Sequence, residues 1–285
     1  MRLAGAITQG SGTYNEDGYG LIEQHGQVSA AWVFDGVTGI NGENYLPAAS
    51  DAQWLVERAH LHLSKLAAMA LTLPDILQQL VDCLIADWNE ISPRVRLPAG
   101  YDHPAACLLL VKRYPNGWQV LRLGDSFLLT RGNGVVLHPS PPSSLNDFED
   151  HLRREARRRR AQGMFDFKAL LAEFRHEHLA NRMSRNTPGN YGILVADSSA
   201  LCMPQLLDLG WPKIMLLCTD GFYRAVDTYG VTDDAGILAA CAVPGGATNM
   251  LSAIRAAEAA DPLCQRHLRF KPADDATAIC LVSEP

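Results

Sequence analysis

The stretch from Ala105 to His138 constrains the fold of this chain more strongly than any other segment. It reads AACLLLVKRY-PNG-WQVLRLGDSFLLTR-GNG-VVLH, so apolar runs are separated by Asn116-Gly117 and by the Gly-Asn-Gly sequence at 132–134. Such glycine-containing pairs accept the positive φ angles of the tight turns that join antiparallel strands. The segment therefore predicts a β-meander of three or four strands.

The remaining strands and helices are expected in separate blocks. Strand-like runs occupy residues 1–35, and two segments with helical periodicity follow within residues 48–92. After residue 185, strands are expected in YGILVAD, KIMLLCTDG and ATAICLVSE, and helical pieces in DAGILAACAV and NMLSAIRAAEAAD. Because these blocks do not alternate strictly, they favour an α+β layered sandwich over a doubly wound parallel sheet.

The length of 285 residues suits one large domain or two small ones, and we expect a single domain over residues 1–285. Apolar residues make up 47% of the chain, and no apolar run is long enough to span a membrane. Seven cysteines without a Cys-x-x-Cys pair indicate buried thiols in a reducing cytoplasm. The net charge of −6 argues against a nucleic-acid-binding protein. We therefore expect a cytoplasmic protein that binds neither membranes nor nucleic acid.

A basic helical insert is expected at about 140–190. Residues 151–185 hold ten Lys and Arg side chains against four Asp and Glu, and they include the run LRREARRRR. A solvated helical face explains this charge, and so does a docking surface for an acidic or phosphorylated partner. The sequence leaves both interpretations open.

Carboxylates recur where the expected strands begin or end, and one more, Asp125, lies inside the expected meander. They occur in YNEDGYG, VFDG, LGDS, LLCTDGF and KPADDAT, and they are Glu16, Asp17, Asp35, Asp125, Asp220, Asp274 and Asp275. If several of them meet at one rim, they repel one another unless cations neutralise them. Mg²⁺ and Mn²⁺ prefer such oxygen ligands. Gly36, which follows Asp35, would let the backbone approach an ion closely.

The motifs NED, VFDG, LGDS, LLCTDGF and DDAT resemble, in sequence and order, those of the metal-dependent serine/threonine phosphatases of type 2C. The resemblance runs from about residue 5 to residue 283 and suggests a divergent member of bacterial type. It implies a four-layer αββα sandwich with two central antiparallel sheets. It also implies hydrolysis of phosphoserine and phosphothreonine in proteins, with a cognate Ser/Thr kinase as the opposing enzyme.

The resemblance further implies a site for two Mn²⁺ or Mg²⁺ ions at one edge of the sandwich. Asp35 would bridge the ions, the Gly36 carbonyl would bind one of them, and Asp220 and Asp274 would bind the other. Asp125 matches the ligand of a weaker third ion. A hydroxide that bridges the metals would attack phosphorus directly.

Two residues of the first motif complete the implied catalytic set. Glu16 and Asp17 would hold metal-bound waters. Asp274 is preferred over Asp275 as the ligand because of the register of the DDAT motif. In the family the ligand comes directly before an Asn or Asp, and that residue stands two positions ahead of a Thr or Ser, here Thr277. These roles follow from the family pattern and not from the spacing alone.

The chain departs from the family pattern at three positions. Gly12 stands where many members have an arginine that holds the substrate phosphate, and Val37 replaces a histidine of the eukaryotic members. Arg224 replaces a second aspartate of the additional-metal site. We expect Arg224 to exclude the third ion and to contact the phosphate, since guanidinium groups match phosphate oxygens. The alternative is a salt bridge from Arg224 to Asp125.

Three further residues are candidates for contact with the substrate. His103 precedes a strand of the meander and is a candidate acid for the leaving group, although a lone histidine is more often structural. Arg182 and Arg185, in the basic insert, would reach a phosphorylated substrate from there, or they are ordinary surface arginines. Because the phosphate arginine is missing, a phosphatase-like binding or regulatory module with weak or no turnover is the alternative to an enzyme.

Overall fold

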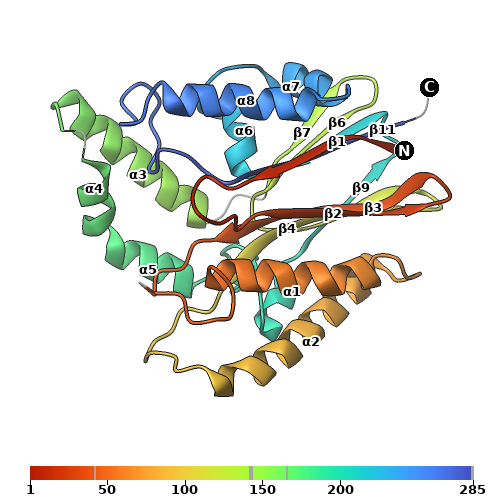
Figure 1. Ribbon diagram of the computed structural model, residues 1–285, viewed down its shortest axis with the longest axis horizontal. Coiled ribbons are helices and arrows are strands. Elements are labelled where there is room, and N and C mark those ends of the chain that lie inside the picture. Colours follow the sequence, from red (N-terminus) through yellow and green to blue (C-terminus); the bar gives the residue numbers. More distant parts are fainter. Residues whose placement is uncertain (42, 141–143, 165, 284–285) are drawn as a thin grey trace.

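The computed structural model describes residues 1–41, 43–140, 144–164 and 166–283, and its strands form two antiparallel sheets (Figure 1). Residues 141–143 and 165 of the expected insert, residue 284 of the expected last strand and residue 285 lie outside the described residues. The sheets pack face to face, and helices cover the outer face of each. The predicted αββα sandwich is confirmed.

The first sheet contains both the first and the last strand of the chain. Within the described residues it has five strands in the order β1 (Arg2–Gln9), β11 (Ala276–Val282), β10 (Ile214–Cys218), β6 (Phe127–Arg131) and β7 (Val135–His138). Neighbouring strands are antiparallel throughout. The last strand therefore occupies an interior position, between β1 and β10.

The second sheet is built from the middle of the chain. Its order in the described residues is β2 (Gly18–Gln24), β3 (Gln27–Val37), β4 (Ala105–Tyr114), β5 (Gly117–Leu123) and β9 (Gln205–Gly210), and β8 (Leu194–Val195) pairs with β4. Tyr114 pairs with Gly117 across a two-residue turn, as the Asn-Gly signal predicts. The strand β9 was not anticipated from the sequence.

The predicted meander is divided between the two sheets, which corrects the sequence-based expectation. Its strands form the hairpin β4–β5 in one sheet and the hairpin β6–β7 in the other. The chain crosses between the sheets at Gly124, Asp125 and Ser126. Gly124 has a φ of 84°, and a Cβ there would collide with Cys107, so this crossing requires glycine. Asp125 thus lies at the rim of the sandwich and not within a continuous sheet.

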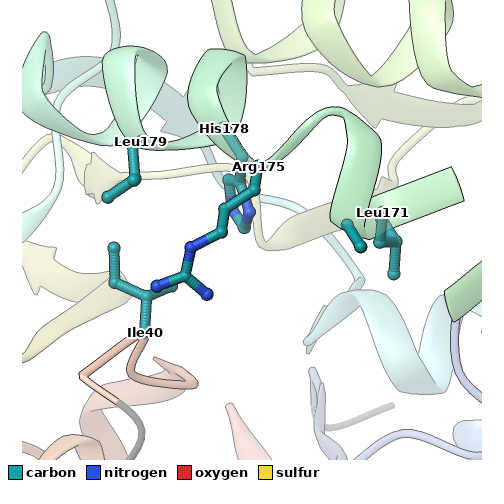
Figure 2. A pocket seen from close by; sticks show the side chains of 6 residues that line it. Ile40, Leu171, Arg175, His178 and Leu179 are labelled. Atoms are coloured by element: carbon teal, nitrogen blue, oxygen red, sulfur yellow. The ribbon is translucent and has the colours of Figure 1, made fainter. Parts of the chain in front are cut away.

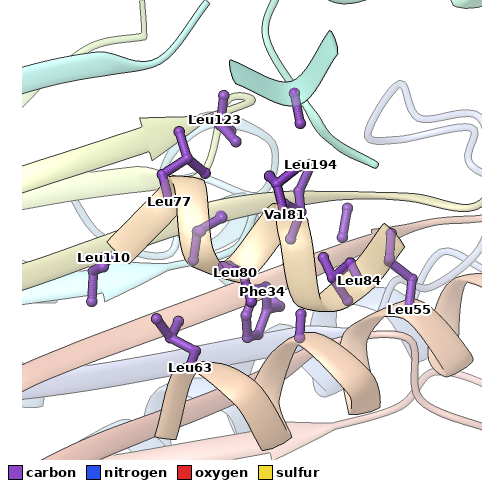
Figure 3. Close-up of a cluster of buried hydrophobic side chains, with 14 of the residues drawn as sticks. Phe34, Leu55, Leu63, Leu77, Leu80, Val81, Leu84, Leu110, Leu123 and Leu194 are labelled. Carbon is purple, nitrogen blue, oxygen red and sulfur yellow. The ribbon is translucent and has the colours of Figure 1, made fainter. Parts of the chain in front are cut away.

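Two helices cover the second sheet. They are α1 (Asp51–Leu66) and α2 (Leu73–Ile91), with the 3₁₀ turns η1 (Ser92–Arg94) and η2 (Ser198–Leu201) beside them. Figure 3 shows Leu80 and Leu84 of α2 packed over Phe34 of β3. All three side chains are fully buried, and each stabilises the fold by roughly 1.5–3 kcal/mol.

Three helices cover the first sheet. They are α6 (Asp220–Asp227), α7 (Asp234–Cys241) and α8 (Gly246–Ala259), and their apolar faces pack on β10 and β11. The helix α6 begins at Asp220, within the TDG motif, and was not anticipated from the sequence. No helix in the described part of the chain combines the length and apolar character needed to cross a bilayer.

The basic segment forms three helices at one end of the sandwich (Figure 1). They are α3 (Ser144–Ala161), α4 (Phe167–Glu173) and α5 (Arg175–Met183). Ala156 and Leu170 pack against Cys264 and Phe270, which connects the insert to the segment that precedes β11. Part of the positive charge is paired within the insert, because Glu155 forms salt bridges with two of its arginines.

Candidate functional site

Three strands bring the predicted carboxylates to one edge of the sandwich. Asp35 lies on β3, Asp220 begins α6 just after β10, and Asp274 precedes β11. The strand β3 does not end at Asp35, as the sequence suggested, but continues to Val37 in register with Ala105 of β4. The carboxylate of Asp35 therefore projects from a paired and rigid backbone.

A pocket of about 220 Å³ opens beside these carboxylates. Its lining consists of Ser11, Gly12, Thr13, Tyr14, Glu16, Asp17, Asp35, Gly36, Thr38, Lys271, Asp274 and Asp275. Asp125 and Asp220 are outside this lining but near enough to Asp35 to influence its ionisation. Segments more than 230 residues apart in the chain therefore share one concave site.

The glycines that follow Asp35 and Asp220 have a clear structural reason. A Cβ at Gly36 would collide with the backbone carbonyl of Glu16, and one at Gly221 would collide with that of Asp275. Each Asp-Gly pair thus allows the backbone of another acidic segment to pass closely. The glycines help to bring the carboxylates together.

Burial and mutual repulsion disfavour the charged forms of Asp35, Asp17 and Asp274. Burial raises the pKa of Asp35 well above its ordinary value, and Asp220, Asp17, Asp125 and Asp274 raise it further. Burial also raises the pKa of Asp17 well above the usual range, despite a hydrogen bond of 2.8 Å from the Thr219 hydroxyl. The rim is therefore electrostatically strained unless positive charge is present.

Hydrogen bonds hold the loop that carries Glu16. The hydroxyls of Thr38 and Ser50 each donate to the Glu16 carboxylate at 2.6 Å. Asp275 accepts from the backbone N–H groups of Ser11 and Glu16, both at 2.7 Å. Through these hydrogen bonds Asp275 connects the loop to the start of β11. Its neighbour Asp274 lies at the pocket.

Two cationic side chains contact Asp274. Arg224 forms a salt bridge with one carboxylate oxygen, and Lys271 forms one with the other. The partner of Arg224 is thus Asp274 and not Asp125, and the Arg224 side chain does not line the pocket. Sequence analysis missed Lys271, although its position three residues before Asp274 was a usable signal. Burial alone would lower the pKa of Lys271, but Asp274 and Asp220 raise it overall, so its ammonium group stays charged.

The segment that carries Lys271 and Asp274 is organised by Asp261. The carboxylate of Asp261 accepts from the backbone N–H groups of Gln265, Arg266 and His267, and it pairs with Arg269 at 2.7 Å. Burial alone would raise the pKa of Asp261, but these donors hold it well below its ordinary value.

The change Asp261→Asn is expected to lower the free energy of unfolding by about 2 kcal/mol at pH 7. Because the folded-state pKa is depressed, this stabilisation is present above about pH 4 and is lost as the pH falls through the folded-state value. Urea denaturation at several pH values measures the free energy of unfolding. The difference in this free energy between wild type and Asp261→Asn should become smaller below about pH 4. The exposed Asp82→Asn is the control, and an equal effect of both changes would contradict this role.

The other predicted substrate contacts are outside the lining of the pocket. His103 packs against Trp88 with ring centroids 4.6 Å apart, and burial lowers its pKa. Arg182 and Arg185 each lie 3.1 Å from the buried carboxylate of Asp102. The structure thus gives His103 a packing environment and commits both arginines to an internal ion pair, and none of the three lines the pocket.

A second pocket, of about 270 Å³, lies between the insert and the loop that follows β3 (Figure 2). It is lined by Ile40, Leu171, Ala172, Arg175, His178 and Leu179. Figure 2 shows the Arg175 guanidinium extending toward Ile40. Because the described residues that line this pocket include no carboxylate, they offer no donor set for a hard cation.

The first pocket has the donor chemistry of a site for hard divalent cations. Its candidate donors are oxygen atoms, and no described residue donates a hydrogen bond to Asp35. Asp274, in contrast, is engaged by side-chain cations. Within the described ranges, no three His, Cys, Asp or Glu side chains form a preassembled metal-binding group. The residues that line the pocket fit such ions by charge and donor type. Among the lining carboxylates, Asp35 is the one most available to bind an ion.

Comparison with known proteins identifies the fold. The sequence matches no family model and no curated protein. The serine/threonine phosphatase Stp1 from Staphylococcus aureus superimposes with a TM-score of 0.57 at 15% identity, over 100% of this chain and 98% of that one. The Mycobacterium tuberculosis phosphatase PstP/Ppp gives a TM-score of 0.56 at 13% identity, over 98% of both chains.

The chain has the fold of the bacterial serine/threonine phosphatases. A third solved structure, the catalytic domain of the phosphatase PstP in complex with two manganese ions, gives a TM-score of 0.54 at 15% identity, over 98% of this chain and 97% of that one. The resemblance to type 2C phosphatases that the sequence motifs indicated is thus confirmed at the level of the phosphatase fold.

Proposed function

We propose that this protein is a divalent-cation-dependent phosphatase that acts on phosphoserine and phosphothreonine in proteins. The observation that supports it best is the convergence of Asp35, Asp220 and Asp274 beside one small polar pocket. The phosphatase fold and the manganese ions of the PstP structure are consistent with it. A phosphorylated protein as substrate, a cognate kinase and a cytoplasmic location belong to the same proposal.

The acidic residues take distinct roles in this proposal. Asp35, the Gly36 carbonyl, Asp220 and Asp274 would hold two Mn²⁺ or Mg²⁺ ions. Asp125 would contribute to a weaker third, since Arg224, which was expected to exclude that ion, pairs with Asp274 and not with Asp125. When bound, such ions neutralise charge on the phosphoryl oxygens and supply a water nucleophile at neutral pH.

Glu16 and Asp17 orient water from the far side of the pocket. Hydrogen bonds from the hydroxyls of Thr38, Ser50 and Thr219 hold these two carboxylates in place. A fixed carboxylate suits the task because it orients a water molecule without first having to be ordered.

A binding or regulatory module is the second candidate. Two observations favour it: Gly12 stands where the family pattern has a phosphate-binding arginine, and Arg224 occupies one oxygen of Asp274. Such a module would retain the pocket and recognise phosphorylated proteins without efficient turnover.

Metal dependence of hydrolysis separates the two candidates. We expect purified protein to hydrolyse p-nitrophenyl phosphate and a phosphothreonine peptide with Mn²⁺ or Mg²⁺, and to lose this activity in EDTA, because the acidic rim cannot stabilise a phosphate dianion by itself. Release of nitrophenol and of inorganic phosphate measures it. Calorimetric binding of Mn²⁺ without turnover of either substrate would favour the module instead.

A further inference from the structure

The pocket has a charge imbalance that matters for an anionic substrate. Five acidic side chains line it, namely Glu16, Asp17, Asp35, Asp274 and Asp275. Among the described lining residues, Lys271 alone carries a positive charge. The carboxylates repel a phosphate monoester that enters the pocket. The ester therefore needs a positively charged side chain that contacts its phosphate oxygens.

The position expected to supply that contact has no side chain. A Cβ at Gly12 would have no atom within 4 Å, so this part of the pocket wall is open. Gly12 and Lys271 line the same pocket. The cationic side chain that is missing on one wall is therefore present on another.

Lys271 is built to reach into the pocket from a fixed backbone. Phe270, on one side, packs against the insert, and the carbonyl of Pro272, on the other, accepts a hydrogen bond of 3.1 Å from Arg269. The Lys271 side chain is 51% exposed, in contrast to 12% for Arg224. Its ammonium group contacts Asp274, so it already lies at the acidic rim. Lys271 can thus move toward a ligand, whereas Arg224 is confined beside Asp274.

We propose that Lys271 binds the phosphoryl group of the substrate, in place of an arginine at position 12. The proposal rests on the function proposed above, since it assigns a residue to that pocket. An ammonium group is a point donor that adapts to a phosphate oxygen, and such a charged hydrogen bond strengthens binding by about tenfold to a hundredfold.

The test measures binding as well as turnover. In Mg²⁺-loaded protein, Lys271→Ala is expected to weaken binding of inorganic phosphate in calorimetry by about tenfold to a hundredfold, and to raise KM for p-nitrophenyl phosphate similarly. Lys271→Arg should restore most of both. Lys271→Gln, a neutral polar side chain one atom shorter than lysine, should behave like the alanine variant. The matched control is Lys213→Ala, an exposed lysine at the opposite end of β10.

The outcomes separate this proposal from the proposed function. If Lys271→Ala and Lys271→Gln bind phosphate as tightly as wild type while metal-dependent hydrolysis persists, Lys271 has no such role and the phosphatase remains. If the wild type binds phosphate without turnover and Lys271→Ala loses that binding, the Lys271 proposal holds and the catalytic function fails. Absence of both binding and turnover in the wild type overturns both.

Discussion

Asp35→Asn is expected to reduce metal-dependent phosphoester hydrolysis by about 10³-fold, which corresponds to about 4 kcal/mol of transition-state stabilisation. The amide has the shape of the carboxylate but lacks its charge, and Asp35 is the carboxylate that faces four acidic neighbours. The uncharged amide at position 35 removes the attraction between the Asp35 carboxylate and divalent cations. Initial rates of p-nitrophenyl phosphate hydrolysis over a range of Mn²⁺ concentrations measure the effect.

The same variant is expected to lose activity but to gain thermal stability when no metal is present. Because burial and neighbouring charges disfavour ionised Asp35, Asp35→Asn should melt at a higher temperature than wild type in EDTA at neutral pH. It should also lose the stabilisation that Mn²⁺ gives the wild type. The control is Asp208→Asn, an exposed residue on the edge strand β9. Turnover within tenfold of wild type would show that Asp35 does not hold the ions.

Asp102→Asn is expected to lower the free energy of unfolding by about 3 to 5 kcal/mol. Asp102 and Arg182 are 7% and 5% exposed, so the change leaves buried arginine charge without a counter-charge. Arg182 also donates to the Thr38 carbonyl at 2.9 Å, which links the insert to the pocket. Chemical denaturation measures the loss, and proteolysis should become faster between α3 and α5.

Two comparisons make the Asp102 experiment decisive. Glu90→Gln removes a salt bridge to Arg94 in which both side chains are about two-thirds exposed, and it should cost less than about 1 kcal/mol. The double change Asp102→Asn with Arg182→Met should recover part of the loss, because the buried positive charge is reduced. A loss below about 1 kcal/mol for Asp102→Asn would mean that water reaches these arginines.

Local sequence patterns predicted most of the fold because its strands and turns are locally encoded. The Asn-Gly and Gly-Asn-Gly turns give the two hairpins, and amphipathic periodicity gives α1 and α2. The transfer of the chain between sheets at Gly124–Ser126 was not predictable in this way. Hairpin signals report which strands pair but not which sheet they join, and β9 has no strong signal of its own.

The candidate site shows the same division between local and long-range information. Carboxylates at strand ends are visible in sequence, and the structure brings Asp35, Asp220 and Asp274 to one edge. The partners of Arg224, Arg182 and Arg185 depend on contacts between distant segments. The sequence therefore offered these arginines only as candidates for the substrate, with a salt bridge or the surface as the alternative. Sequence analysis also missed Lys271, although its place three residues before Asp274 is a local signal.

The interior position of β11 has a consequence for synthesis on the ribosome. The segments with Asp35 and Asp220 emerge first, but the backbone N–H of Thr219 donates to the Thr277 carbonyl at 3.0 Å only once β11 has inserted between β1 and β10. Until then Asp274 has no fixed place. A nascent or prematurely terminated chain that lacks β11 therefore has no assembled pocket.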